Sequence, residues 1–226
     1  MLHFDIVKQS KIEKTFRVAK IEGDFDLKPE HADEHFVGDL DVPDNWQIGL
    51  IVGGSGTGKT TIAKNLFGDH IISQQKYSHK SVIDDMPKGM SVTDISKMFY
   101  AVGFGSVPSW LKPYNVLSNG EKMRVDIAKG LAENDFVVFD EFTSVVDRQV
   151  AKVASMAIHK MIKKQPNKKF IAISCHHDIE NWLEPDWVFN TDEMQFHFIQ
   201  ATGIGKNLKS ESVIVPNGES LGNITI

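Results

Sequence analysis

The chain has 226 residues, of which 41% are hydrophobic and 24% are charged, a composition that fits one globular domain with a sizeable core. The formal net charge of −5 argues against broad, non-specific binding to nucleic acid. A single cysteine excludes an intrachain disulfide and suits a reducing compartment, so we expect a cytoplasmic protein. Because no apolar run approaches ~18 residues and no secretory signal is evident, we expect no direct membrane insertion.

The N-terminal part of the chain, from residue 4 to about 40, contains stretches in which apolar and polar side chains alternate. Thr15–Ile21 is the clearest of them. A period of two is typical of β-strands. We therefore predict antiparallel strands in this part of the chain.

The strongest functional signal follows the apolar run Ile48–Val52. Residues 53–60 read GGSGTGKT and match the phosphate-binding pattern G-x-x-x-x-G-K-[ST] at every fixed position. A buried strand, such a loop and a helix after it aim several backbone N–H groups and the positive end of the helix dipole at one point. In this pattern Lys59 reaches the β- and γ-phosphates and Thr60 ligates Mg²⁺. We therefore predict a nucleoside triphosphate site made by Gly53, Gly54, Ser55, Gly56, Thr57, Gly58, Lys59, Thr60 and Thr61.

The segment from about 74 to 116 is predicted to form a small helical lobe, with 92–102 as its clearest helix. After it comes a helix start: Ser118 and Glu121 form an S-x-x-E capping box, which predicts a helix to residue 133. A capped helix N-terminus is also an anion site. Capping explains neither Leu117 nor Gly120.

A second apolar run, Phe136–Phe139, ends in Asp140 and Glu141. A buried parallel strand of this kind delivers acids to the sheet edge where nucleotides bind. We predict that Asp140 belongs to the Mg²⁺ shell and that Glu141 acts as the general base on the attacking water.

Residues 117–122, LSNGEK, match the signature L-S-x-G-[EQ]-[KQR], and with the other two motifs the chain resembles the ATP-binding cassette (ABC) superfamily from about residue 16 to 198. The resemblance implies an α/β fold of the P-loop NTPase type, with a parallel core sheet, an antiparallel β subdomain and a small helical lobe. It implies ATP and Mg²⁺ as cofactors and hydrolysis of ATP to ADP and phosphate. It also implies a head-to-tail dimer, in which Ser118 and Gly120 of one copy bind the γ-phosphate held by the loop of the other.

Two further roles implied by the resemblance have more than one match. The adenine-stacking aromatic is predicted to be Phe25, with Phe36 as the rival. The switch histidine that senses the γ-phosphate follows the predicted strand at 170–174 and is either His176 or His177.

A glutamine usually ends the strand after the loop helix in this family. Gln74 and Gln75 lie too soon after Lys59 for this role, and the more suitable region, 81–87, offers Asp84 and Asp85 instead. An aspartate can ligate Mg²⁺, so we predict Asp85 as a metal ligand.

These features predict one ABC ATPase domain over residues 1–226, with a flexible tail from about 203 to 226. We expect an ATP-hydrolysing, dimerising switch or motor that acts on an unidentified protein or nucleic-acid partner. The alternative is the nucleotide-binding subunit of a membrane ABC transporter, which the missing glutamine and the short interval between Lys59 and Ser118 disfavour. A small-molecule kinase shares the phosphate loop but has no need of residues 117–121.

Overall fold

The structure of the protein is a computed structural model that describes residues 1–8, 13–26, 34–72, 75–78 and 80–199. Within these ranges the strands are β1 (Leu2–Lys8), β2 (Glu34–Leu40), β3 (Ile48–Val52), β4 (Phe136–Phe139), β5 (Lys169–Ser174), β6 (Trp187–Asn190) and β7 (Gln195–Phe198). The α-helices are α1 (Phe16–Asp24), α2 (Lys59–Phe67), α3 (Val92–Ala101), α4 (Val107–Trp110), α5 (Asn119–Glu133), α6 (Arg148–Lys163) and α7 (Glu180–Leu183). Short 3-10 turns are η1 (Gly68–His70), η2 (Tyr114–Val116) and η3 (His177–Ile179).

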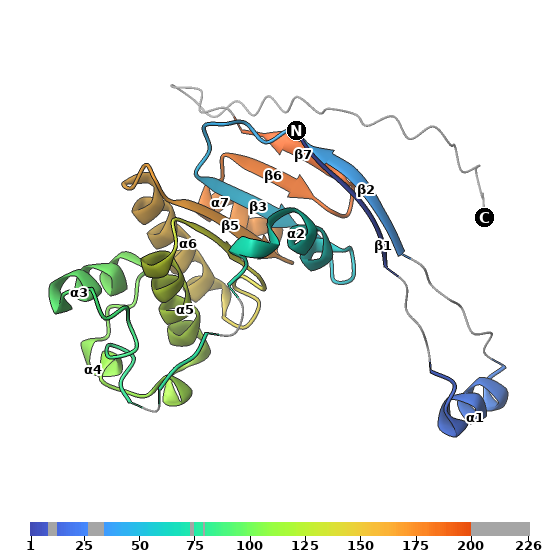
Figure 1. Cartoon of the computed structure of the whole chain (residues 1–226), viewed down its shortest axis with the longest axis horizontal. Helices are drawn as coiled ribbons and strands as arrows, with labels where there is room; N and C mark the ends of the chain where they lie inside the picture. The colour runs from blue at the N-terminus through green and yellow to red at the C-terminus, as the bar shows by residue number, and fades with distance from the viewer. Residues whose placement is uncertain (9–12, 27–33, 73–74, 79, 200–226) are drawn as a thin grey trace.

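A five-stranded sheet in the order β4-β5-β3-β6-β7 forms the centre of the molecule (Figure 1). Its first four strands run parallel, and β7 pairs antiparallel with β6. β3 is buried along its whole length, as expected for an apolar run between two parallel neighbours. The carboxyl ends of β3, β4, β5 and β6 therefore meet at one edge, which is where ligands bind in open parallel sheets.

Other elements cover both faces of this sheet. On one face, Leu50 belongs to a core that includes buried side chains of α3, α5 and α6. On the other face, Ile51 packs with Ile62 and Phe67 of α2 and with Phe4 of β1. The two residues of β3 face opposite cores because side chains alternate along a strand.

The expected antiparallel strands are β1 and β2, which pair from Leu2 opposite Leu40 to Lys8 opposite Glu34. They form a two-stranded sheet of their own. Phe4 and Leu40 are buried, and the Phe4 ring meets Phe189 of β6 edge-on with centroids 5.9 Å apart. This contact joins the ribbon to the core sheet.

The prediction of a strand at Thr15–Ile21 is wrong, because this segment forms helix α1. Thr15 caps the helix by accepting a hydrogen bond from the Val18 N–H. Val18, Ile21 and Phe25 also recur at intervals of three and four, which is the period of one helix face. Figure 1 shows α1 apart from both sheets, and none of its residues is buried.

Most other predicted elements are confirmed to within one or two residues: the strands at 48–52, 136–139 and 170–174 are β3, β4 and β5, and the helices at 92–102 and 119–133 are α3 and α5. Helices α3 and α4 lie in the predicted helical lobe, where Trp110 donates to the Phe104 carbonyl at 2.9 Å. The predicted tail at 203–226 lies outside the described residues. None of the helices in the described ranges is long and apolar enough to cross a membrane.

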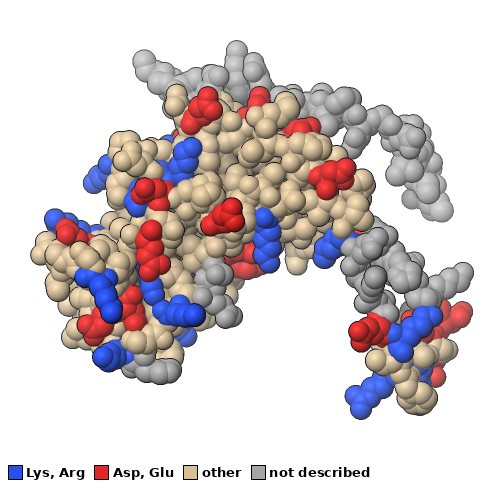
Figure 2. Space-filling view, in the orientation of Figure 1, with Lys and Arg blue, Asp and Glu red and all other residues tan. Residues whose placement is uncertain are grey.

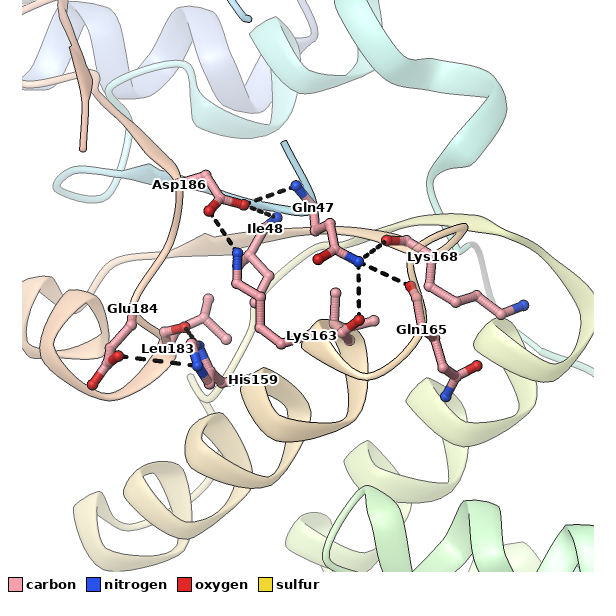
Figure 3. Close-up of polar contacts among 10 residues, drawn as sticks. Gln47, Ile48, His159, Lys163, Gln165, Lys168, Leu183, Glu184 and Asp186 are labelled. Atoms are coloured by element: carbon pink, nitrogen blue, oxygen red, sulfur yellow. Dashed lines mark hydrogen bonds and ion pairs between the residues drawn. The ribbon is translucent and has the colours of Figure 1, made fainter. Parts of the chain in front are cut away.

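A polar cluster fixes the start of β3 (Figure 3). One oxygen of Asp186 accepts from the backbone N–H groups of Gln47 and Ile48 at 2.8 and 2.9 Å, and the other accepts from Lys163 of α6 at 2.6 Å. Burial works to raise the pKa of Asp186, but the Lys163 ammonium and the two N–H groups outweigh it and hold that pKa below its usual value. The strand that leads into the glycine-rich loop is therefore fastened to β6 and α6.

Candidate functional site

The glycine-rich loop lies between β3 and α2 at the carboxyl edge of the sheet. Gly56 and Gly58 have φ of +86° and +87°, a region that residues with a Cβ rarely adopt. No atom lies within 4 Å of where a Cβ on Gly56 would point. Helix α2 starts at Lys59, and its N-cap residue Gly58 has no side chain to cap the N–H groups of the first turn. This is the geometry of an anion site.

The first two residues of α2 make polar contacts at this edge: Lys59 with the loop itself, and Thr60 with Asp140 after β4. The Lys59 ammonium donates to the Gly54 carbonyl at 2.5 Å and so lies over the loop. Thr60 donates to Asp140 at 3.1 Å, which joins the start of α2 to the end of β4. The structure thus brings together two of the three predicted Mg²⁺ ligands, Thr60 and Asp140, and their hydroxyl and carboxylate oxygens suit that ion. Ser55 is exposed at the loop tip, and Thr61 is half-buried on α2.

The chain turns sharply after β4, and this turn exposes Glu141. Glu141 and Thr143 have φ of +54° and +65°, and the buried Thr143, being β-branched, is strained there. The turn is held by two backbone donors: the Phe142 N–H donates to the Ile173 carbonyl of β5 at 2.8 Å, and the Glu141 N–H donates to the Asp140 carboxylate at 2.9 Å. Glu141 therefore stands next to the Thr60–Asp140 pair.

The two candidate switch histidines have different surroundings. The His176 ring lies near Cys175, with Nδ1 at 3.5 Å from the sulfur. His177 Nε2 lies 3.4 Å from one oxygen of Asp192, whose other oxygen accepts from the Gly54 N–H at 2.8 Å. The geometry connects His177, rather than His176, with the phosphate loop.

Two further residues lie at this edge, Thr191 and Asp192, and neither was predicted from the sequence. They lie in the turn between β6 and β7, and the Thr191 and Thr57 hydroxyls are 2.6 Å apart. No motif marks them. Their only signal is topological: these residues follow β6, which runs parallel to β3, so they lie at the same edge of the sheet as the loop.

The two candidate aromatic residues also lie in different places. Phe25 is at the end of α1, with 68% of its surface exposed. Phe36, on β2, lies so close to the loop that a Cβ on Gly58 would be 2.5 Å from its ring. The ring beside the phosphate loop is therefore that of the rival, Phe36.

The signature segment begins α5 with a complete capping box. Ser118 accepts from the Glu121 N–H at 3.3 Å, and Glu121 accepts from the Ser118 N–H at 2.9 Å. The two residues that capping left unexplained have packing reasons: Leu117 is buried, and a Cβ on Gly120 would lie 3.1 Å from Val150 of α6. Ser118 itself is exposed.

The start of α6 is fixed to the segment that follows β5. Asp147 caps α6 by accepting from the Val150 N–H at 2.9 Å. Arg148 makes a two-pronged ion pair with Asp178, the residue after His177. This ion pair therefore joins the start of α6 to the segment that carries His177.

The residues considered for the position of the missing glutamine lie in different places. Ile71 forms an isolated parallel bridge with Val138 of β4, and the Ile72 N–H donates to the Val138 carbonyl at 3.0 Å. Gln74 lies outside the described residues. Asp85 is not at a strand end: it accepts from the Ser78 N–H at 2.9 Å, within the segment that leads into the helical lobe.

Gln75 and Tyr77 attach this segment to helix α5. Gln75 donates to the Asp126 carbonyl at 2.8 Å. Both oxygens of the half-buried Asp126 carboxylate accept phenolic protons, from Tyr77 at 2.6 Å and Tyr114 at 2.7 Å. The two rings stack at 3.9 Å, and a Cβ on Gly130 would collide with Ile72. We call Tyr77, Tyr114 and Asp126 the tyrosine clasp.

No protein-family model matches the sequence, and no curated protein matches it. Solved structures do match. The dimeric structure of a bacterial ABC transporter cassette is 13% identical over 83% of this chain and 92% of its own, with a TM-score of 0.56. The cbiO1 protein from Clostridium perfringens, part of the ABC transporter complex cbiONQ, is 19% identical over 72% and 79%, with a TM-score of 0.54.

A third match is a bacterial Atm1-family ABC exporter with ATP bound, at 20% identity and a TM-score of 0.50. The match covers 64% of this chain but only 32% of the exporter's chain. At these identities the comparisons establish the shared fold, a mixed α/β cassette with a largely parallel sheet.

Proposed function

We propose that this chain, which has the fold of an ABC ATPase cassette, binds ATP with Mg²⁺ and hydrolyses it in a head-to-tail dimer of two copies. The single observation that carries the proposal is the start of α2. There an uncapped helix N-terminus, two glycines at positive φ and the Lys59 ammonium converge on one point. A triphosphate supplies the anionic oxygens that such a point binds.

The residues around this point have separate roles in the proposed reaction. Thr60 and Asp140 would hold the Mg²⁺ ion, which neutralises charge on the phosphates when it is bound. Glu141, exposed beside them, accepts a proton from the attacking water. His177 is the proposed switch histidine, and Phe36 supplies the ring against which the adenine stacks.

We propose a dimer because the start of α5, where the signature residues 117–122 lie, can bind a phosphate that a second copy holds. The described hydrogen bonds of the Ser118 hydroxyl are with Glu121 of the same helix, and Ser118 is exposed. A capped helix start with an exposed hydroxyl can bind the γ-phosphate held by a second copy. One of the structural matches is itself a dimeric cassette.

We propose that ATP hydrolysis drives a switch that acts on a protein or nucleic-acid partner. The face in Figure 2 carries both signs of charge interspersed rather than one basic surface, which favours a protein partner. The alternative, a transporter subunit, gains support from the transporter cassettes among the matches.

The binding site is tested by Lys59→Ala. The substitution removes a charge aimed at the phosphates and should cost about 1.5–3 kcal/mol, more than tenfold in affinity. Equilibrium titration with a fluorescent ATP analogue measures the change. Lys64→Ala is the matched control, because it removes an exposed lysine from the same helix. Equal affinities for wild type and Lys59→Ala would mean that the loop is not the site.

A further inference from the structure

The turn between β6 and β7 lies against the phosphate loop, and we propose that its Asp192 is a positioning residue that holds His177 toward that loop. The inference rests on the proposed function, because positioning matters only where a phosphate is bound and cleaved. Asp192 is 138 residues from Gly54 in the sequence, yet its carboxylate touches the loop backbone.

One carboxylate makes both contacts. Its first oxygen accepts from the Gly54 N–H at 2.8 Å, and its second lies 3.4 Å from His177 Nε2. Gly54 is the second residue of the loop and His177 is the third residue after β5. Asp192 therefore links the ends of two neighbouring strands through their loops.

The turn that carries Asp192 is itself held in place. The Thr191 N–H donates to the Val52 carbonyl at 2.8 Å, and the buried Thr191 hydroxyl pairs with that of Thr57 at 2.6 Å. The Asp192 N–H donates to the Asn190 side chain at 2.9 Å. Gly53 allows this approach, because a Cβ there would collide with the Thr191 hydroxyl. A side chain fixed by its neighbours can orient another one.

His177 needs such an orienting contact because 56% of its side chain is exposed. Without Asp192 the imidazole is free to leave the loop, whereas Lys59 and the backbone N–H groups of the loop stay in place. Loss of Asp192 should therefore reduce turnover more than it reduces ATP binding.

The structural half of the proposal is tested without nucleotide, by NMR on the full chain. In Asp192→Ala, hydrogen exchange of the Gly54 amide should speed up by about tenfold, since a charge-assisted bond is lost. The ¹⁵N resonances of the His177 ring should shift in the same variant. Asp192→Asn keeps an oxygen for Gly54 and should retain its protection. Glu193→Gln, which removes the next carboxylate along the turn, should leave both signals unchanged.

The functional half is tested by steady-state ATPase kinetics. Asp192→Ala should lower kcat by about tenfold or more, while KM changes by less than about threefold. The double variant with His177→Ala should be no slower than His177→Ala alone, because Asp192 acts through that residue. Additive losses, or unchanged Gly54 and His177 signals in Asp192→Ala, would overturn the proposal. A wild-type chain that hydrolyses no ATP would instead refute the proposed function, and the NMR result would still decide whether Asp192 holds His177.

Discussion

The carboxylate of Asp186, the residue before β6, bonds to the start of β3 and to Lys163 of α6. Removing its charge in Asp186→Asn should lower the free energy of unfolding by about 1.5–3 kcal/mol near pH 7, because its bonds to Lys163 and to two backbone N–H groups weaken. The native pKa of Asp186 lies below its unfolded value, so this stabilisation is present above the unfolded pKa and is lost as pH falls through the native one.

Urea unfolding from pH 7 to pH 3 checks this expectation. The difference in free energy of unfolding between wild type and Asp186→Asn should approach zero toward pH 3. Asp135→Asn is the control: Asp135 also pairs with a lysine, but 75% of its side chain is exposed, so the change should cost less than about 1 kcal/mol at any pH. A gap that stays constant with pH would show that the ionised form of Asp186 is not what matters.

Single residues of the site differ in how far the sequence could assign them. Lys59, Thr60, Asp140 and Ser118 lie at fixed positions of local motifs, so their neighbours in sequence reveal them. Asp192 and Thr191 reach the loop only because β6 pairs in parallel with β3, a long-range arrangement that no local spacing encodes. The same arrangement separates His177 from His176, which adjacent positions alone could not do.

At the scale of elements, the tyrosine clasp attaches the segment after α2 to helix α5. Burial, together with the nearby Asp126 carboxylate, raises the pKa of Tyr77 well above its usual value. Tyr77→Phe leaves an oxygen of Asp126 without its phenolic donor and should cost about 1.5–3 kcal/mol at pH 8. Because the native pKa is raised, the stabilisation is complete below the unfolded pKa of about 10 and is lost as pH rises beyond it.

Urea midpoints at pH 8 and pH 10.5 test this contribution of Tyr77 to stability. The difference in midpoint between wild type and Tyr77→Phe should be smaller at pH 10.5. Tyr100→Phe serves as the control, because Tyr100 is exposed and lies outside the clasp. The prediction is wrong if both variants behave alike.

Elements with strong local signals were predictable, and two with weak signals were not. β3 is a continuous apolar run, α5 has a capping box, and α6 starts at an Asp cap, so each is defined by adjacent residues. Thr15–Ile21 has both an alternation of apolar and polar side chains and a helical spacing of apolar ones. The segment forms a helix, which the Thr15 cap stabilises. The bridge at Ile71 involves a single residue, which is too short to leave a pattern in the sequence.

For the whole molecule, the head-to-tail dimer makes association and catalysis interdependent. Glu141→Gln removes the proposed base but keeps the phosphate contacts, so it should slow turnover by roughly 10²–10⁴ and accumulate a dimer in ATP and Mg²⁺ that ADP does not support. Light scattering behind size exclusion measures the mass under each condition.

Ser118→Arg in the Glu141→Gln background is the matching control for this dimer. Arginine places bulk and an unmatched cation at the proposed interface, so the dimer should disappear. A Glu141→Gln chain that stays monomeric in saturating ATP, while wild type still hydrolyses it, would defeat the dimer mechanism for the isolated chain.

The contact between Phe36 and the Gly58 turn bears on which nucleoside triphosphate the chain accepts. A phenyl ring has no hydrogen-bonding group, so stacking on it tolerates every base. GTP should therefore compete for the site with a Kd within about tenfold of that for ATP, and Phe36→Ala should weaken both by a similar ~1–3 kcal/mol. Competition titrations with the two nucleotides measure this, and a hundredfold preference for ATP would mean that other groups read the base. If the expectation holds, the relative cellular supply of the two purine nucleotides, rather than recognition of the base, decides which of them powers the protein.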